Sequence, residues 1–288
     1  MKTGVIGLGA MGAGMANNLA KANLLETVYN RTLSKAEEIA KECGCSISMT
    51  PADVAEQSEL VIICVSRDED VLEMVNAIKD SVKPDTIVVD TSTVSSDTAK
   101  QAAEILNEVG AHFLDCPVSG GTEGAKNGTL AVMVGGDEAQ LEKARSTLDA
   151  IGGNIVYIGP SGSGQATKAV NQIMAAGINQ AVTEALAFGK AMGLPMDKVV
   201  DIVATGAAGN WFLDHRGKTM LAGTYEPGFK LALHHKDLTI CQSMTKSISE
   251  NALPTIEMTL IHYQRLMDEG YGDEDISALF RLKEKALN

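Results

Sequence analysis

The chain has 288 residues, of which 45% are hydrophobic and 21% charged, which is typical of a folded globular protein rather than a disordered one. Its 24 basic and 37 acidic residues give a net charge of −13, so we expect neither nucleic acid nor an anionic membrane surface as a partner. No apolar run approaches the roughly eighteen residues of a membrane span. The length fits one or two domains.

The N-terminus and the cysteines favour a cytoplasmic location. Met1-Lys2-Thr3-Gly4 leads into a strand-like run and lacks the apolar stretch and cleavage site of a signal peptide. The five cysteines are odd in number and contain no CxxC, which fits a reducing compartment. Neither cysteines nor histidines show the spacing of metal ligands, so we predict no metal.

The first half of the chain alternates between short apolar strands and segments with helical spacing. Strands are expected at Thr3–Ile6, Thr27–Tyr29, Leu60–Val65, Thr86–Val89, His112–Leu114, Leu130–Val134 and Asn154–Ile158, and helices at Met11–Lys21, Ser34–Cys43, Val71–Lys79 and Ser95–Val109. This alternation predicts a doubly wound, Rossmann-type parallel sheet with helices on both faces.

After about Pro160 the pattern is helical only. A long helix is expected from Gln165 to Met192, about 40 Å at 1.5 Å per residue, ended by Gly193. Further helices are expected near Val199–Thr205, Phe212–Leu221, Leu231–Ser249, Thr255–Glu269 and Ile276–Leu287. We therefore predict an α/β domain at residues 1–161 and an all-α domain at residues 162–288, built on the long interdomain helix.

A glycine motif joins the first predicted strand to the first predicted helix. Gly7-Leu8-Gly9-Ala10-Met11-Gly12 is a GxGxxG in the strand–turn–helix context in which it binds a dinucleotide. Backbone N–H groups and the helix dipole at that helix start favour a diphosphate. A glycine-rich turn without a ligand is the alternative.

The residues after the second strand bear on which dinucleotide binds. NAD-binding domains place an Asp or Glu there for the ribose hydroxyls, whereas this chain has Asn30-Arg31-Thr32. Asn does not repel a 2′-phosphate, and Arg31 can form a charge-assisted pair with it. We therefore predict NADP(H) rather than NAD(H), the alternative being that Arg31 is an ordinary solvated residue. Val65 and Ser66, at the end of a later strand, are expected to line the cofactor.

Two further segments carry candidate chemistry. Lys168 and Asn171 lie one turn apart on the long helix and project from one face. Drawn into a partly desolvated cleft, Lys168 would become a usable acid or base; the alternative is a lysine that extends its amine to solvent over apolar surface. Ser119-Gly120-Gly121 follows a strand and offers N–H groups suited to a carboxylate, although a plain turn has the same composition.

Four stretches together resemble the β-hydroxyacid dehydrogenase family, which includes 3-hydroxyisobutyrate dehydrogenase, tartronate semialdehyde reductase and glyoxylate/succinic semialdehyde reductases. They are the glycine motif with its continuation to Leu19, Asp115–Thr122, Gly162–Asn171 and His235-Lys236-Asp237-Leu238. The resemblance implies that Lys168 is the general acid/base, and that Ser119, Gly120, Gly121, Asn171 and Lys236 bind a small carboxylate substrate. It also implies that Thr93 and Lys236 touch the cofactor, with Asp237 orienting Lys236 or being structural.

The function predicted is hydride transfer between NADP(H) and a small hydroxy acid or aldehyde acid. 6-Phosphogluconate dehydrogenases are disfavoured because they have a much longer C-terminal domain and a His–Asn pair after the lysine. Imine reductases are disfavoured because they usually lack the lysine. A protein that senses NADP(H) or acts as a scaffold without turnover is the alternative from another class. The apolar second domain predicts a homodimer or homotetramer, and the sequence leaves the substrate open.

Overall fold

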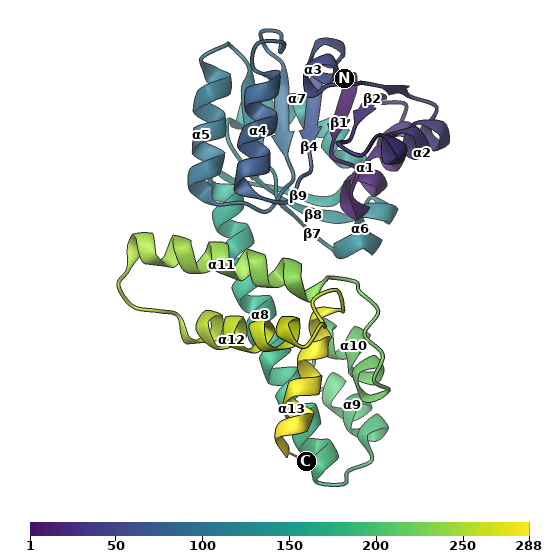
Figure 1. Cartoon of the computed structure of the whole chain (residues 1–288), viewed down its shortest axis with the longest axis vertical. Helices are drawn as coiled ribbons and strands as arrows, with labels where there is room; N and C mark the ends of the chain where they lie inside the picture. Colours follow the sequence, from purple (N-terminus) through teal and green to yellow (C-terminus); the bar gives the residue numbers. More distant parts are fainter. Residues whose placement is uncertain (288) are drawn as a thin grey trace. The chain divides into compact units, whose positions relative to one another are not determined.

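The computed structural model describes residues 1–287, which divide into two compact units, Met1–Lys168 and a second that begins at Ala169 (Figure 1). The first unit is a sheet covered by helices, and the second is helical. This confirms the predicted fold class, an α/β Rossmann-type unit followed by an all-α unit.

The sheet of the first unit has the strand order β3-β2-β1-β4-β5-β6-β8-β7, with β9 paired to β8. Its strands are β1 (Thr3–Ile6), β2 (Leu25–Tyr29), β3 (Ser46–Ile47), β4 (Leu60–Ile63), β5 (Ile87–Asp90), β6 (His112–Asp115), β7 (Val118–Ser119), β8 (Leu130–Gly135) and β9 (Gly152–Gly159). The order reverses beside β1, and in such sheets ligands bind at the carboxyl ends of the strands next to that reversal.

The predicted parallel sheet has an antiparallel exception at one edge. The strands from β3 to β6 are parallel, but β8 runs antiparallel to both β6 and β7. Only the short helix α6 (Gly121–Asn127) separates β7 from β8. A parallel neighbour needs a crossover that returns the chain to the opposite end of the sheet, and this connection is too short for one.

Helices cover both faces of the sheet, as predicted. They are α1 (Ala10–Lys21), α2 (Leu33–Cys43), α3 (Pro51–Gln57), α4 (Asp68–Ile78), α5 (Ser96–Asn107), α6 and α7 (Glu138–Asp149), of which α3, α6 and α7 were not predicted. Successive residues of β4 enter different cores, Ile62 on one face and Ile63 on the other. This alternation is what a sheet buried on both faces requires.

The second unit is built on α8 (Ser163–Ala191), which begins within the first unit. The other helices are α9 (Met196–Ala204), α10 (Trp211–Leu221), α11 (Leu231–Ile248), α12 (Pro254–Asp268), the short 3₁₀ helix η1 (Ile276–Ala278) and α13 (Leu279–Leu287). Tyr263 and Phe280 are fully buried in its core. Within residues 1–287, no helix combines the length and apolarity needed to cross a bilayer.

Candidate functional site

The glycine motif forms the turn from β1 into α1. Gly7 has φ of +96°, and a Cβ there would overlap the carbonyl oxygen of Cys64. A Cβ on Gly12 would overlap the carbonyl oxygen of Gly7. At Gly9, by contrast, no heavy atom of the described chain lies within 4 Å of a built Cβ. The turn therefore needs glycine at two positions for its own packing and leaves room at the third, where a diphosphate fits.

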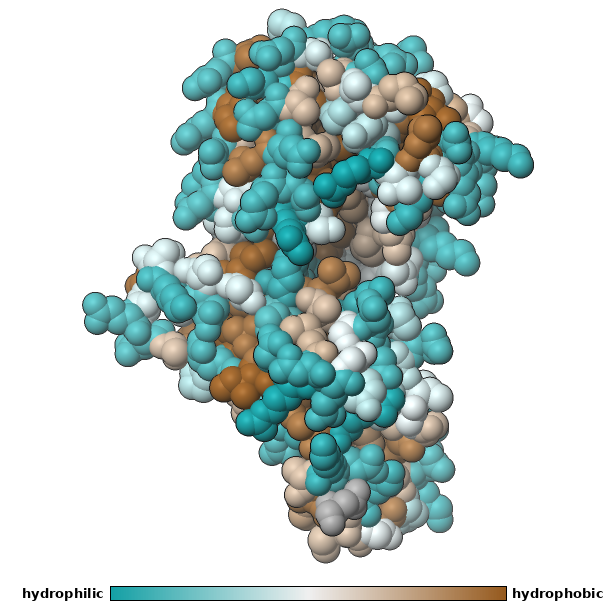
Figure 2. Space-filling model, viewed as in Figure 1, coloured by the Kyte–Doolittle hydropathy of each residue, from teal (hydrophilic) through white to brown (hydrophobic). Residues whose placement is uncertain are grey.

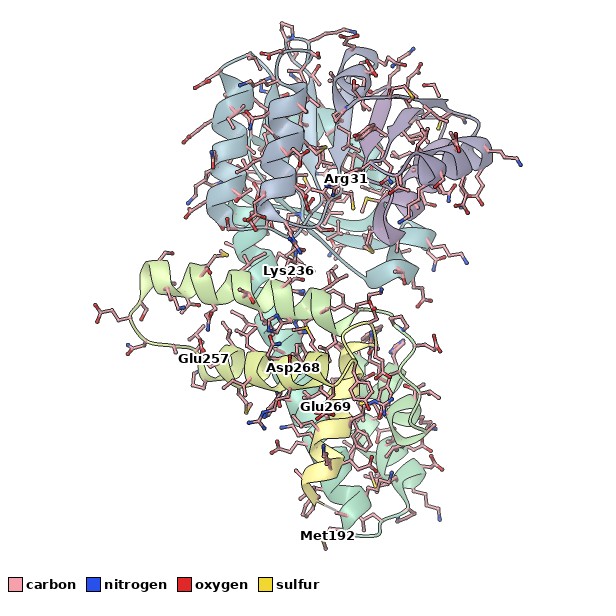
Figure 3. The ribbon with its side chains drawn as sticks, in the orientation of Figure 1. Arg31, Met192, Lys236, Glu257, Asp268 and Glu269 are labelled. Carbon is pink, nitrogen blue, oxygen red and sulfur yellow. The ribbon has the colours of Figure 1, made fainter. Side chains whose placement is uncertain are left out.

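The segment after β2 is tied to this turn. Asn30 Oδ1 accepts a hydrogen bond from the Leu8 N–H at 2.9 Å, and its Nδ2 donates to the Thr32 carbonyl at 3.0 Å. Thr32 is the N-cap residue of α2. The Arg31 side chain is 82% exposed and lies 3.7 Å from Asp70 on α4 (Figure 3). Asn30 thus has a local role that the sequence did not suggest, and the Arg31 guanidinium remains accessible to an anion.

The loops after β4 and β5 are joined by hydrogen bonds that the sequence did not reveal. Val65 N–H donates to Ser92 Oγ at 2.9 Å. Gln165, near the start of α8, accepts from the Val94 N–H at 3.2 Å and donates to the Ser92 carbonyl at 2.9 Å. Gln165 thereby fixes the backbone on both sides of Thr93, which is half-buried, whereas Ser66 beyond Val65 is exposed.

Asp115, at the end of β6, caps the start of α8. Its carboxylate accepts from the Gly162 N–H at 2.8 Å and from the Gln165 N–H at 3.0 Å. Burial raises the pKa of Asp115 to about 6, against the lowering effect of these backbone donors. A Cβ on Gly164 would overlap the carbonyl oxygens of Asp115 and Met133. The position of the helix that carries Lys168 is therefore set by its contacts with the sheet.

Lys168 and the Ser119-Gly120-Gly121 segment lie together in the first unit. The Lys168 side chain is buried, and its Nζ donates to the Val118 carbonyl at 2.8 Å. The segment is more ordered than the predicted loop, because Ser119 ends β7 and Gly121 begins α6. Gly120 and Gly121 both have positive φ, of 135° and 63°, which favours glycine at these positions. A lysine extending its amine into solvent is not what the structure shows.

In the second unit, four polar side chains form a continuous chain of contacts. Asn171 Nδ2 donates to Gln172 Oε1 at 2.8 Å, and Gln172 Nε2 donates to Asp237 Oδ2 at 2.6 Å. The other Asp237 oxygen lies 2.8 Å from Lys236 Nζ on α11 (Figure 3). Asp237 thus contacts Lys236, as one of the two predicted roles requires. Gln172 was not predicted, and nothing in its spacing marks it.

The pair His234-His235 is packed rather than arranged as metal ligands. His234 is fully buried, with Nδ1 3.0 Å from the Tyr263 hydroxyl and Nε2 3.2 Å from the Gln172 carbonyl oxygen. His235 is half-buried, and burial lowers its pKa.

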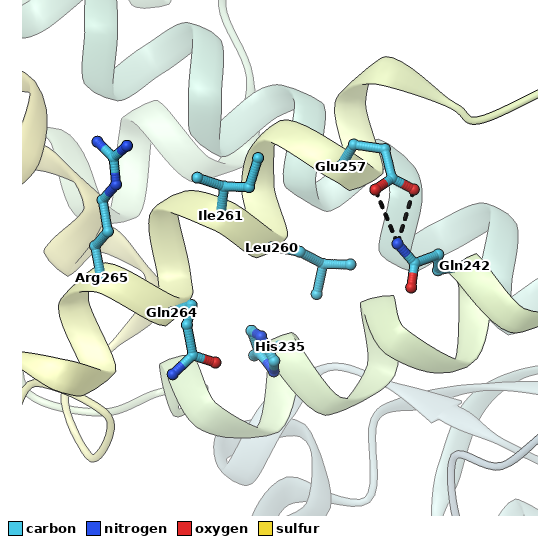
Figure 4. A pocket seen from close by; sticks show the side chains of 7 residues that line it. All are labelled: His235, Gln242, Glu257, Leu260, Ile261, Gln264 and Arg265. Carbon is cyan, nitrogen blue, oxygen red and sulfur yellow. Dashed lines mark hydrogen bonds between the residues drawn. The ribbon is translucent and has the colours of Figure 1, made fainter.

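A groove of about 430 Å³ lies between α11 and α12 (Figure 4). Its lining is His235, Gln242, Glu257, Leu260, Ile261, Gln264 and Arg265. Gln242 Nε2 donates to both Glu257 oxygens at 2.8 Å. None of the predicted site residues lines this groove, so it is not the candidate site.

Comparisons with known proteins give this geometry a family. Residues 2–159 match the NAD-binding domain of 6-phosphogluconate dehydrogenase, and residues 162–283 match a model described as the NAD-binding domain of NADP-dependent 3-hydroxyisobutyrate dehydrogenase. The chain is 36% identical to 2-hydroxy-3-oxopropionate reductase of Escherichia coli, over 100% of this chain and 99% of that protein. The chain belongs to the β-hydroxyacid dehydrogenase family. This confirms the resemblance noted in the sequence.

Other members of the family span the same length. NAD-dependent L-serine dehydrogenase of Pseudomonas aeruginosa is 33% identical over 96% of both chains. The structure of 3-hydroxyisobutyrate dehydrogenase of Mycobacterium tuberculosis has a TM-score of 0.89 and 29% identity, covering 98% of this chain and 99% of that one. An imine reductase from Pseudomonas sp., at 19% identity and a TM-score of 0.62, shares the fold. The protein is thus an NAD(P)-binding oxidoreductase of a family that acts on CH–OH groups.

Proposed function

We propose that the protein is an NADP(H)-dependent dehydrogenase that moves hydride between the nicotinamide and a small hydroxy acid or its aldehyde acid. The observation that carries the proposal is the buried Lys168 amine, held by the Val118 carbonyl directly before the Ser119-Gly120-Gly121 segment. A buried amine beside a segment rich in backbone donors offers a proton and a carboxylate site in one place.

The cofactor, when bound, supplies or accepts the hydride. The Gly7–Gly12 turn would hold its diphosphate, while Asn30, Arg31 and Thr32 would lie at the adenosine ribose. Val65, Ser66 and Thr93 follow the carboxyl ends of β4 and β5, where the remainder of a dinucleotide lies in folds of this type. The turn fits this role because only Gly9 faces open space, where a side chain would displace the ligand.

Lys168 is proposed as the general acid and base. In reduction, its ammonium gives a proton to the carbonyl oxygen as hydride reaches the carbon; in oxidation, the neutral amine takes the hydroxyl proton. The Val118 carbonyl accepts one N–H of the amine and so fixes its direction. The hydrogen bonds of Asp115 and Gln165 fix the start of α8 against the ends of β5 and β6, and so fix the position of Lys168 on that helix.

The substrate is proposed to be a small carboxylate. N–H groups at Gly120 and Gly121, with the Ser119 hydroxyl, suit the carboxylate group, and Lys236 would add positive charge. Asn171 would bind the reacting oxygen. Proteins similar to this chain are named for 2-hydroxy-3-oxopropionate, 3-hydroxyisobutyrate and L-serine, and we propose a substrate among such acids or the glyoxylate and succinic semialdehyde class.

The cofactor preference is proposed from Asn30-Arg31-Thr32. No carboxylate occupies this segment to repel a 2′-phosphate, and the accessible Arg31 guanidinium can pair with one. One matching family model is named for an NADP-dependent enzyme and one relative for an NAD-dependent enzyme, so we base the proposed preference on these residues and not on the family.

We also propose a homo-oligomer assembled through the second unit. Large apolar side chains are exposed on α8 at Val170, Met174 and Phe188, and at Met192 just after it, with 57 to 63% of each accessible. Apolar surface is also visible beside α12 (Figure 2), where Ile261 is 55% exposed. Apolar side chains gathered on an exposed face favour a protein partner. Light scattering coupled to gel filtration should give the mass of a dimer or tetramer rather than 30.3 kDa.

The central test follows NADPH and NADH absorbance at 340 nm with glyoxylate, succinic semialdehyde, tartronate semialdehyde and methylmalonate semialdehyde, and the reverse reaction with the matching hydroxy acids. Lys168→Ala should lower kcat at least about a hundredfold, as expected for loss of a general acid, and leave NADPH binding unchanged. Lys143→Ala, at an exposed lysine of α7, is the matched control and should keep full activity. NADPH binding without turnover of any acid would instead identify a non-catalytic sensor.

A further inference from the structure

In the contacts from Asn171 to Lys236, the Asp237 carboxylate determines which group donates and which accepts in each hydrogen bond. The Lys236 ammonium can only donate, so the Asp237 oxygen 2.8 Å away accepts. The second Asp237 oxygen lies 2.6 Å from the Gln172 amide, and a carboxylate has no proton to offer it. Gln172 must therefore turn its Nε2 toward Asp237.

This orientation passes to Asn171. With Nε2 committed to Asp237, Gln172 presents Oε1 to Asn171, and that oxygen can only accept. Asn171 must then turn its Nδ2 toward Gln172 at 2.8 Å, which leaves its Oδ1 on the side away from Gln172. Amide nitrogen and oxygen have nearly the same size, so shape alone would not select between the two orientations.

The middle of the chain of contacts is rigid. Gln172 is 2% exposed and Asp237 4% exposed, so water does not compete for these bonds. The Gln172 backbone is held as well, because its carbonyl accepts from His234 Nε2, itself fully buried. A buried polar group that loses its partner is costly, and reversing one amide would leave two such mismatches.

We propose that Gln172 and Asp237 are positioning residues that hold the Asn171 carboxamide with its oxygen toward the substrate, so that, while Lys168 is protonated, Asn171 selects a substrate hydroxyl by accepting a hydrogen bond from it. The inference rests on the proposed function, in which Asn171 binds the reacting oxygen. In this orientation Asn171 recognises the alcohol form of the substrate and not the carbonyl form, because a carbonyl oxygen has no proton to donate in a hydrogen bond.

Asp237→Asn should reverse the whole chain of contacts. The new amide would keep its oxygen toward the Lys236 ammonium and turn its nitrogen toward Gln172. Gln172 would then rotate to accept, its Nε2 would face Asn171, and Asn171 would have to present its N–H groups to the substrate. Gln172→Leu would instead cut the connection and leave the Asn171 amide free to take either orientation.

The test compares a hydroxy acid with the acid that lacks only the reacting hydroxyl. The pairs are glycolate with acetate, 4-hydroxybutyrate with butyrate, 3-hydroxyisobutyrate with isobutyrate and glycerate with lactate; the pair used is the one whose aldehyde acid the wild type reduces. Inhibition constants are measured at saturating NADPH. In the wild type, the hydroxy acid should bind about threefold to tenfold tighter than its partner, as for one neutral hydrogen bond.

Asp237→Asn should lower the KM for the aldehyde acid relative to the inhibition constant of the hydroxy acid by about threefold to tenfold, because the reversed Asn171 N–H can donate to a carbonyl oxygen that the wild-type Oδ1 cannot bind. Gln172→Leu should change the same ratio in the same direction but by less, because it leaves the amide free to take either orientation. Any effect on carboxylate binding through Lys236 affects both acids of a pair and cancels. Gln180→Leu is the matched control: Gln180 is also buried on α8 but bonds to Thr259 and His262, and its loss should leave the ratio unchanged.

A wild-type hydroxy-acid preference near one would overturn the assignment, and so would an unchanged ratio of aldehyde-acid KM to hydroxy-acid inhibition constant in folded Asp237→Asn. Thermal unfolding of each variant shows that it is folded, and Asp237→Asn, which keeps the side-chain shape, serves if Gln172→Leu is unstable. Failure of the proposed function has a different result, since Lys168→Ala would then keep its turnover or the wild type would reduce none of the aldehyde acids.

Discussion

The glycine turn of the first unit is formed by main-chain atoms, whereas the Asn171–Lys236 contacts of the second unit are formed by side chains. The turn relies on main chain, with glycines where a Cβ would overlap a carbonyl oxygen and a backbone N–H bonded to Asn30. The contacts of the second unit run through side chains alone, with a buried carboxylate at their centre.

The two constructions fail in different ways. A site made of main chain tolerates many residue types outside its glycines, but a side chain added at a glycine overlaps neighbouring backbone. A chain of side-chain hydrogen bonds keeps its shape after an isosteric change but can reverse its polarity, because donors and acceptors exchange without a change in volume. Substitutions that add a methyl group to the turn, neutralise a buried carboxylate or remove a guanidinium should therefore have different effects on stability and on binding at the two kinds of site.

The largest effect is expected from Gly12→Ala. The new Cβ would overlap the Gly7 carbonyl oxygen, which is backbone and cannot rotate away. We expect the free energy of unfolding to fall by about 1–3 kcal/mol, as for overpacking of a core. The affinity for NADPH should fall at least about a hundredfold, or about 2.7 kcal/mol. Urea unfolding and fluorescence titration with NADPH measure the two effects.

Gly9→Ala is the control that separates folding from binding. Its Cβ would meet no heavy atom of residues 1–287 within 4 Å, so the stability should fall by no more than about 1 kcal/mol, the usual difference between Gly and Ala at a helix N-cap, the position that Gly9 holds on α1. Its NADPH affinity should still fall, because the methyl group occupies the space of the diphosphate. Unchanged affinity in Gly9→Ala would show that the cofactor does not approach this turn.

The difference in construction also explains what the sequence could predict. The glycine motif, most of the strands and the second unit's helices were predictable because hydrophobic spacing and backbone geometry restrict the residue type at each position. The helix α7 was missed, although Asp137 caps it and Leu141, Ala144 and Leu148 are buried at helical spacing. The sequence pattern of this helix is therefore as clear as that of the predicted ones.

The side-chain contacts were not predictable in the same way. Gln172 and Asp237 are 65 positions apart, and Asp115 and Gly162 are 47 apart. Nothing in a glutamine or an aspartate shows its partner until the fold brings the two together. The family resemblance pointed to Asp237 next to Lys236. Only the three-dimensional contacts identify Gln172 as the residue that connects Asp237 to Asn171.

An intermediate effect is expected at Asp90, a buried carboxylate that contrasts with Asp237. Asp237 faces the Lys236 ammonium, whereas Asp90 Oδ1 accepts from the Ser92 N–H at 3.0 Å and its Oδ2 has no hydrogen-bond partner within residues 1–287. Burial raises the pKa of Asp90 to about 7, although bonds from Ser92 oppose the rise. The folded protein therefore binds this proton more tightly than the unfolded chain does.

The sign of the pH dependence follows. The protonated carboxyl group stabilises the fold fully below about pH 4, its ordinary pKa, and this contribution is lost as the pH rises through about 7. Asp90→Asn is neutral throughout, so its stability relative to wild type should rise by up to about 1.4 kcal/mol per pH unit between these values and then level off. Urea unfolding at pH 5, 6, 7 and 8 tests this. Parallel stability curves for the two proteins would contradict it.

The smallest effect on stability, and the most selective effect on function, is expected at Arg31. Its guanidinium is exposed and only 3.7 Å from Asp70, so Arg31→Ala should change the unfolding free energy by no more than about 0.5 kcal/mol. If Arg31 pairs with a 2′-phosphate, the KM for NADPH should rise about tenfold, a loss of about 1.4 kcal/mol, while the KM for NADH stays within about twofold. Arg31→Lys keeps the charge but loses the two-pronged geometry and should fall between the two. Equal changes for both cofactors would place Arg31 outside the cofactor site, and the absence of an acidic residue at Asn30 would then be the only basis for NADP(H) preference.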